Sequence, residues 1–234
     1  MVFVDNLCKK FGDNSVLDGL NLEILAGDSF ALIGPNGAGK TTLVKILSTL
    51  LKPTLGTVCV SGYDVTLEPE EVRKRIGVTS HNTFLYDDLT AKENLEFYGE
   101  LYGLNKDEIE KKVDLLLKKA NLRLRAHDQV SNFSRGMKQR LSIVRAIICD
   151  PDILILDEPS TGLDVASKKK FYEMVREQNT AGKTILLATH DLREVEMLCT
   201  KAAILDKGKI QKSGKIKDLK SDGLLEDVFT ELTN

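Results

Sequence analysis

The sequence predicts an α/β fold built on a parallel sheet, and two observations carry that prediction. First, the apolar run 30–33 leads into a glycine-rich stretch, 34–42, which opens a helical pattern. Second, short and mainly apolar runs are typical of strands buried on both faces of a parallel sheet, and they occur at 153–156, 184–189 and 202–205. A helical pattern separates the first two runs, so strand and helix alternate as in a doubly wound sheet.

The composition bounds the class of protein. The chain of 234 residues suffices for one substantial domain, and its 42% hydrophobic content, 29% charged content and net charge of −2 are typical of a soluble globular protein. This charge indicates no basic surface for nucleic acid. No apolar run approaches the roughly 18 residues of a membrane span, and the N-terminus does not resemble a signal peptide, so we expect a cytoplasmic chain. The four cysteines show no metal-binding spacing.

The first part of the chain is predicted to be rich in β-structure. Residues 1 to about 33 alternate short apolar runs with turns, which indicates an N-terminal antiparallel β subdomain, and Phe11 lies in one of the turns. After the helix that follows the glycine-rich stretch, 57–60 and 75–78 are expected to be strands that frame a turn at 61–64.

From about residue 84 the apolar period becomes helical, which predicts an inserted helical subdomain. Helices are expected around 95–102 and 109–117, and Asn105 with Glu108 resembles a capping box at the start of the second. A third helix is expected over 137–148, with Ser134 as its N-cap. Beyond the buried strands, a hairpin turn is predicted at 206–209 and a short helix around 224–229.

The glycine-rich stretch fits G-x-x-x-x-G-K-S/T, the phosphate-binding loop of P-loop NTPases. Its glycines let successive N–H groups converge on an anion, and the helix that follows adds the positive end of its dipole. Lys40 can then reach the β- and γ-phosphates, and Thr41 can ligate Mg²⁺. The alternative is a glycine-rich turn that matches by accident. The predicted nucleotide-binding residues of the loop are Gly34, Pro35, Asn36, Gly37, Ala38, Gly39, Lys40, Thr41 and Thr42.

Acidic residues at the end of a buried strand would complete an ATPase site. Asp157 and Glu158 directly follow the run 153–156, so Asp157 is expected to hold Mg²⁺ and Glu158 to polarise the attacking water. His190, at the end of the next apolar run, can donate a hydrogen bond toward a γ-phosphate. The alternatives are two solvated loop carboxylates and a structural histidine.

Taken together, five segments resemble the ATP-binding subunits of ABC transporters, in the order and spacing of that family and over nearly the whole chain. These segments are 34–42, 133–140, 156–159, 161–164 and 188–190. The resemblance implies a head-to-tail dimer that holds two ATP molecules, each between the phosphate loop of one subunit and the signature segment, 133–140, of the other. Ser134 and Gly136 would then bind the γ-phosphate across the interface, although a helix cap would look the same.

The resemblance assigns roles to two further residues. Phe11 matches the aromatic residue that stacks on adenine, with a core aromatic as the alternative. Asp164 matches the loop through which the two ATP sites communicate, with a helix-capping aspartate as the alternative.

The sequence departs from the family pattern at three positions. His81 stands where the family usually has Gln, at the hinge between the core and the helical subdomain. A neutral imidazole accepts one hydrogen bond, so we expect His81 to serve near Mg²⁺ and to couple the two parts. Arg135 and Met137 replace the usual Gly and Gln of the signature segment.

The resemblance also predicts how the chain is divided. We expect a single ABC ATPase domain over 1–234, with a core over about 1–80 and 150–215, a helical subdomain over about 82–149 and a short C-terminal extension over about 216–234.

The predicted function is ATP binding and hydrolysis in a multi-subunit ABC exporter. The expected partners are an integral-membrane transporter subunit and a second copy of the chain or a homologous ATPase subunit, without nucleic acid. The chain would lie on the cytoplasmic face of the cell membrane. The alternatives are a soluble ABC-type ATPase in assembly or repair and a GTPase or small kinase on the same loop.

Overall fold

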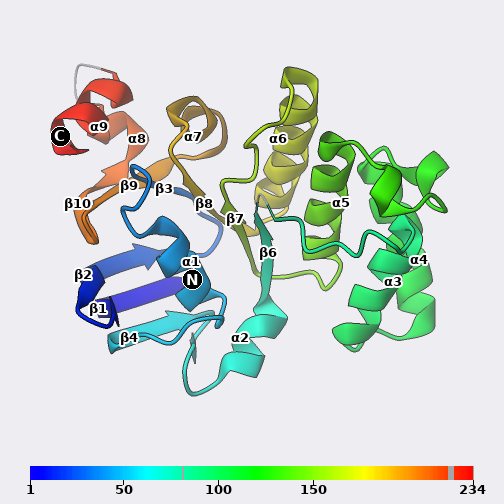
Figure 1. Ribbon diagram of the computed structural model, residues 1–234, viewed down its shortest axis with the longest axis horizontal. Coiled ribbons are helices and arrows are strands. Elements are labelled where there is room, and N and C mark those ends of the chain that lie inside the picture. The colour runs from blue at the N-terminus through cyan, green and yellow to red at the C-terminus, as the bar shows by residue number, and fades with distance from the viewer. Residues whose placement is uncertain (81, 221–223, 234) are drawn as a thin grey trace.

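A six-stranded sheet forms the centre of the computed structural model, which describes residues 1–80, 82–220 and 224–233 (Figure 1). Its strand order is β10-β9-β3-β8-β7-β6. The strands are β3 (Ser29–Ile33), β6 (Ile76–Ser80), β7 (Ile153–Asp157), β8 (Thr184–Thr189), β9 (Lys201–Asp206) and β10 (Lys209–Lys215). All neighbouring pairs are parallel except β9 and β10, which form the predicted hairpin. The prediction of a parallel α/β sheet is confirmed.

The register of the sheet brings the segments that follow its strands to one edge. Ile33 at the end of β3 pairs with Thr189 at the end of β8, and Asp157 at the end of β7 pairs with Ala188. Because carboxyl ends of parallel strands meet at the same edge, the glycine-rich loop, Glu158 and His190 leave the sheet side by side.

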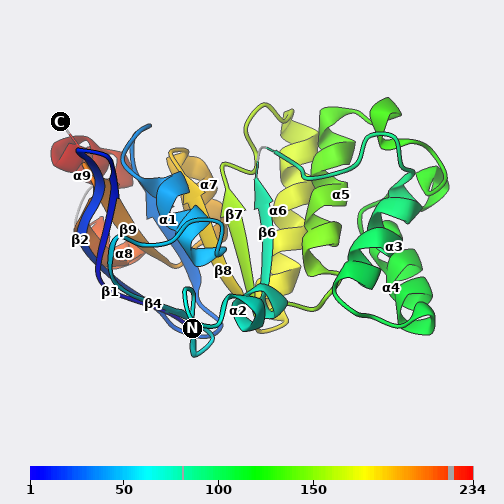
Figure 2. The same ribbon diagram turned by 60° about the horizontal axis from the view of Figure 1, so that its bottom comes forward.

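Alternating residues of the buried strands supply two hydrophobic cores, one on each face of the sheet. In β7, Ile153 and Ile155 pack with α1 (Lys40–Leu47), whereas Leu154 and Leu156 pack toward α5 (Arg135–Ile147) and α6 (Val165–Thr180). Figure 2 shows α1 on one side of the strands and α5 and α6 on the other. This two-sided burial explains why these strands are apolar throughout instead of alternating.

A second, antiparallel sheet covers the α1 side of the molecule. Its strands are β1 (Val2–Phe11), β2 (Asn14–Ile24), β4 (Leu55–Val60) and β5 (Tyr63–Asp64), in the order β2-β1-β4-β5. The N-terminal antiparallel prediction is confirmed, but the expected turn at 61–64 is wrong in part because residues 63 and 64 pair with β4. Arg75 was expected in a strand and instead ends α2 (Pro69–Arg75), a helix whose first position is the proline that favours helix starts.

Helices occupy the segment where the apolar period changes. They are α3 (Ala91–Leu101), α4 (Lys106–Lys119) and α5, with short 3-10 turns at Arg123–Arg125 and Val130–Asn132. The predicted capping box at the start of α4 is confirmed, because Asn105 accepts from the Glu108 N–H while the Glu108 side chain accepts from the Asn105 N–H. Buried residues of these helices belong to the same core as Leu154 and Leu156, so the helical segment is packed continuously onto the sheet.

The last part of the chain contains α6, α7 (Leu192–Leu198), α8 (Ile216–Leu219) and α9 (Leu225–Thr233). The short helix predicted around 224–229 is confirmed as α9, whose Leu225 is buried, while α7 and α8 were not predicted. Among the described residues, none of the helices combines the length and apolar character that crossing a bilayer requires.

Candidate functional site

The glycine-rich loop is shaped by close contacts at two of its glycines. A Cβ at Gly34 would lie 2.4 Å from the Leu205 carbonyl oxygen of β9, so only glycine lets the chain leave β3 along this path. Gly39 is the N-cap of α1 and has a φ of 111°, a conformation that residues with a Cβ rarely adopt. These constraints place the N-terminus of α1, with its unpaired N–H groups, at the mouth of the loop.

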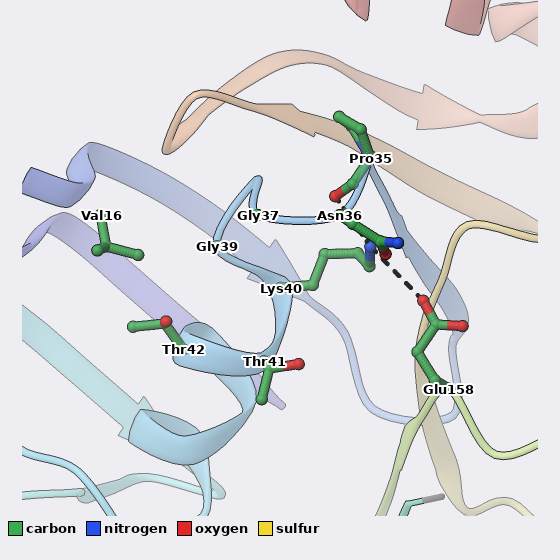
Figure 3. Close-up of a pocket in the computed structure, with 9 residues that line it drawn as sticks. All are labelled: Val16, Pro35, Asn36, Gly37, Gly39, Lys40, Thr41, Thr42 and Glu158. Atoms are coloured by element: carbon green, nitrogen blue, oxygen red, sulfur yellow. Dashed lines mark hydrogen bonds and ion pairs between the residues drawn. The ribbon is translucent and has the colours of Figure 1, made fainter.

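Lys40 lies at the centre of this loop with its side chain 6% exposed. Its Nζ donates to the carbonyl oxygens of Gly34 at 2.6 Å and Pro35 at 3.2 Å. It also lies 3.5 Å from Glu158 Oε1 (Figure 3). A buried ammonium that is held mainly by neutral carbonyls can form a stronger interaction with a phosphate. The loop therefore has the charge and the geometry of a phosphate site.

A cavity of about 330 Å³ opens between the loop and Glu158 (Figure 3). Its lining contains seven of the nine predicted loop residues together with Glu158. Val16, from β2, also lines it and was not predicted, because no motif marks that position. The lining residues are Val16, Pro35, Asn36, Gly37, Gly39, Lys40, Thr41, Thr42 and Glu158.

The first residue after the apolar part of β7 is positioned to hold a cation. Asp157 is 4% exposed, and its Oδ1 accepts a hydrogen bond from Thr41 Oγ1 at 3.3 Å. A carboxylate and a hydroxyl fit Mg²⁺, which takes oxygen ligands and usually binds through few protein groups together with phosphate oxygens. The described part of the chain contains no cluster of three or more His, Cys, Asp or Glu side chains suited to a metal ion.

Glu158 and His190 are brought together from the ends of neighbouring strands. His190 Nδ1 lies 2.8 Å from Glu158 Oε1, and the Glu158 N–H donates to the Ala188 carbonyl at 2.8 Å. Glu158 has a φ of 49°, a left-handed conformation that is strained for this residue type and is concentrated at functional sites. Its carboxylate therefore faces the cavity between an ammonium and an imidazole.

The signature segment, 133–140, includes the start of α5 and lies outside the cavity. Ser134 is exposed and accepts a hydrogen bond from the Met137 N–H at 3.3 Å, so the predicted N-cap of α5 is confirmed. Gly136 has a packing reason to be glycine, because a Cβ there would lie 2.2 Å from Ser167 Oγ of α6. Arg135 lies against Gly162, whose added Cβ would be 2.5 Å from an Arg135 guanidinium nitrogen. None of the residues 133–140 lines the cavity at the phosphate loop.

The three remaining predicted residues have separate positions. Phe11, at the end of β1, is 51% exposed, so the core-aromatic alternative is wrong, and Lys9 Nζ lies 4.9 Å from its ring centroid. Asp164 caps α6, accepting from the Ser167 N–H at 2.9 Å, and these hydrogen bonds lower the pKa of its carboxyl. His81 lies outside the described residues.

Comparisons with known proteins show the family to which this chain is similar. The family described as ABC transporter matches residues 17–161. The chain is 37% identical over 233 residues to the ABC transporter ATP-binding protein NatA of Bacillus subtilis, covering 97% of this chain and 95% of that protein. It is 41% identical over 214 residues to Nod factor export ATP-binding protein I of Cupriavidus metallidurans, covering 92% of this chain and 71% of that protein.

Two solved structures share the fold. One, described as an ATP-binding subunit of an ABC transporter, has a TM-score of 0.92 and 32% identity, with both chains covered completely. The other, a dimeric ATP-binding cassette in a post-hydrolysis state bound to ADP and Pi, has a TM-score of 0.83 and 29% identity, covering 92% of this chain and 99% of that one. With the phosphate loop, the acidic strand end and these relatives in agreement, the chain belongs to the ABC transporter family as an ATP-binding and ATP-hydrolysing subunit.

Proposed function

We propose that this chain drives export through a separate integral-membrane subunit, using ATP hydrolysis at the cavity described above. The observation that carries the hydrolysis part of the proposal is the close approach of Lys40, Glu158 and His190 at one edge of the sheet. The names of several relatives support export in particular, because they refer to Nod factor export and to linearmycin and daunorubicin resistance.

In this proposal each group of the cavity has a distinct role. The N–H groups of residues 34–42 and Lys40 bind the β- and γ-phosphates. Glu158 orients and polarises the attacking water, and His190 holds Glu158 by its 2.8 Å contact. In its imidazolium form His190 has a second N–H, at Nε2, that can donate toward the γ-phosphate. Thr41 and Asp157 would hold Mg²⁺, which neutralises charge on the phosphates. Phe11, half exposed at the end of β1, offers a face for adenine.

The second half of the ATP site comes from another copy of the chain. Ser134 and Gly136 lie at the N-terminus of α5, where the helix dipole favours an anion, yet residues 133–140 do not line their own chain's cavity. A head-to-tail dimer would bring this helix end against the γ-phosphate of the partner's ATP, with Asp164 near the contact between the two sites. The post-hydrolysis dimer among the related structures supports this arrangement.

An exposed aromatic patch supports a membrane-protein partner. Phe84 and Tyr86 are each 47% exposed and Phe97 is 39% exposed, and the Tyr86 and Phe97 rings lie edge to face with centroids 5.0 Å apart. Aromatic residues that gather on a surface are typical of protein interfaces. We place the membrane subunit on this patch, which puts the chain on the cytoplasmic face of the membrane. The division into a core (about 1–80 and 150–215), a helical subdomain (about 82–149) and a C-terminal extension (about 216–234) belongs to the same proposal.

The experiment that tests the function is a pull-down of the tagged chain from detergent-solubilised native membranes, followed by mass spectrometry. We expect a multi-span protein in stoichiometric amount. A Phe97→Ala, Tyr86→Ala variant should lose that protein while keeping its ATPase rate. Leu124→Ala is the control, because Leu124 is 98% exposed and lies outside the patch. Recovery of soluble partners alone would contradict the export proposal and leave the ATPase assignment intact.

A further inference from the structure

Glu194 is a buried acidic residue between the two loops that carry Glu158 and His190. It lies in the first turn of α7 and is 1% exposed. A buried carboxyl is costly unless hydrogen bonds or opposite charges compensate it. Glu194 forms no ion pair among the described residues, and its hydrogen bond is to the neutral Thr189 hydroxyl.

One contact of Glu194 fixes the turn that presents His190. Its Oε2 accepts a hydrogen bond from Thr189 Oγ1 at 2.9 Å, and the same Thr189 oxygen accepts from the Asp191 N–H at 3.1 Å. These two hydrogen bonds join Thr189 and Asp191, the residues on either side of His190, and connect them to Glu194. The imidazole that lies 2.8 Å from Glu158 is therefore carried by a turn whose hydrogen bonds end at Glu194.

Ser160, in the loop that follows Glu158, lies close to the same carboxyl. Oε1 is buried and has no hydrogen-bond partner among the described residues. Ser160, 3% exposed, lies near enough for its hydroxyl to lower the pKa of Glu194, although it donates no hydrogen bond to Oε1 in this structure. The Ser160 oxygen accepts instead from the Tyr172 hydroxyl of α6 at a long 3.4 Å.

We propose that Glu194 is a positioning residue for ATP hydrolysis, which holds the His190 turn through Thr189 and takes Ser160 as a second partner when the site closes on ATP. One carboxyl would then join the two loops that carry the catalytic groups. The inference rests on the proposed catalytic roles of Glu158 and His190.

The surroundings of Glu194 favour a neutral carboxyl that can donate as well as accept. Burial raises its pKa to about 7, the Thr189 and Ser160 hydroxyls oppose that rise, Asp191 adds to it, and Lys168 of α6 opposes it. Of the other titratable groups around it, burial raises the pKa of Tyr172 to about 12 and that of Cys199 above its ordinary value, so both stay protonated at neutral pH. A protonated Oε1 can donate to Ser160 while Oε2 still accepts from Thr189.

The test is steady-state ATPase kinetics of Glu194→Ala and Glu194→Gln. Loss of the hydrogen bond between Glu194 and Thr189 should displace the catalytic groups and leave the phosphate loop unchanged. Glu194→Ala should therefore lower kcat by about tenfold to a hundredfold, with KM within about threefold. Glu194→Gln accepts and donates at the same two positions, so it should recover most of that loss. A kcat of Glu194→Ala near the wild-type value, or equal loss in both variants, would overturn the proposal.

Thr189 gives a second route to the same answer should Glu194→Ala fail to fold. Thr189→Val removes the hydroxyl at nearly constant volume and should lower kcat without raising KM, whereas Thr189→Ser should restore it. A Thr189→Val variant with wild-type kcat would overturn the proposal that Glu194 acts through Thr189. Glu158→Gln is assayed in parallel: if it keeps the wild-type rate, the catalytic assignment fails; if it is inactive while Glu194→Ala is not, only the present inference fails.

Discussion

The two ends of the proposed ATP site differ in how much of their structure is completed within one chain. At the phosphate loop, Lys40 is 6% exposed and contacts two loop carbonyls and Glu158, which in turn contacts His190. At the start of α5, Ser134 is exposed and its side chain caps its own helix by accepting from the Met137 N–H. In the proposed site, one chain therefore assembles the groups for binding and hydrolysis, while the signature segment would bind the ATP that is held by a second chain.

The largest expected effect comes from Glu158→Gln. The amide cannot polarise water as a carboxylate does, so hydrolysis should fall by about a hundredfold to ten-thousandfold while ATP still binds. Because unhydrolysed ATP would stay bound between the phosphate loop of one chain and the signature segment of the other, the variant should be a dimer at saturating Mg-ATP. Size-exclusion chromatography with light scattering measures this. A variant that remains monomeric under these conditions would contradict the two-chain site.

Lys40→Ala should disable the phosphate-loop end alone. It removes a buried cation and its charge-assisted hydrogen bonds, so ATP affinity should fall by about a hundredfold or more in isothermal titration calorimetry. Lys45→Ala is the matched control, because Lys45 lies on the exposed face in the last turn of the same helix. Retained affinity in Lys40→Ala would mean that the loop is not the nucleotide site.

Ser134→Asp should disable the signature end alone. Aspartate is a good N-cap, so α5 should stay folded, but its negative charge would oppose the γ-phosphate of the partner's ATP. We expect a fall in ATPase rate of about tenfold or more, with unchanged ATP affinity of the monomer. Ser134→Asn, which caps without charge, should remain close to wild type. If Ser134→Asp weakened ATP binding to the monomer instead, the proposed division between the two ends would be wrong.

The smallest expected effect is on the free energy of unfolding and comes from the buried carboxyl of Glu194 in α7. Folding raises the pKa of Glu194 to about 7, so between its ordinary pKa and pH 7 the folded chain keeps a proton that the unfolded chain has lost. The contribution of this group to the free energy of unfolding is therefore highest at low pH and falls as pH rises through about 7, where the buried carboxyl becomes charged. Glu194→Gln should therefore be more stable than wild type at pH 8, by on the order of 2 kcal/mol in urea denaturation, and should lose this advantage near pH 4. An equal difference at both pH values would show that charge burial is not its cause.

The sequence predicted those parts of the fold and the site that depend on local pattern. The strand 153–157 and the capping box at Asn105 were predictable because apolar runs and caps act over a few residues. The helices α2 and α7 were missed because each has only seven residues, too few for a clear period. The contact of Glu158 with His190 depends on strand order, and the burial of Glu194 depends on the packing of α7, so neither could be obtained from spacing alone.

The most direct test of the claim that two chains complete each site is to mix two inactive variants. Lys40→Ala keeps its signature segment and Ser134→Asp keeps its phosphate loop, so a dimer of one with the other contains one intact composite site. If the chains exchange freely, half of the dimers are mixed, and an equimolar mixture should recover up to about a quarter of the wild-type ATPase rate. A mixture no more active than the sum of its separate components would contradict the account.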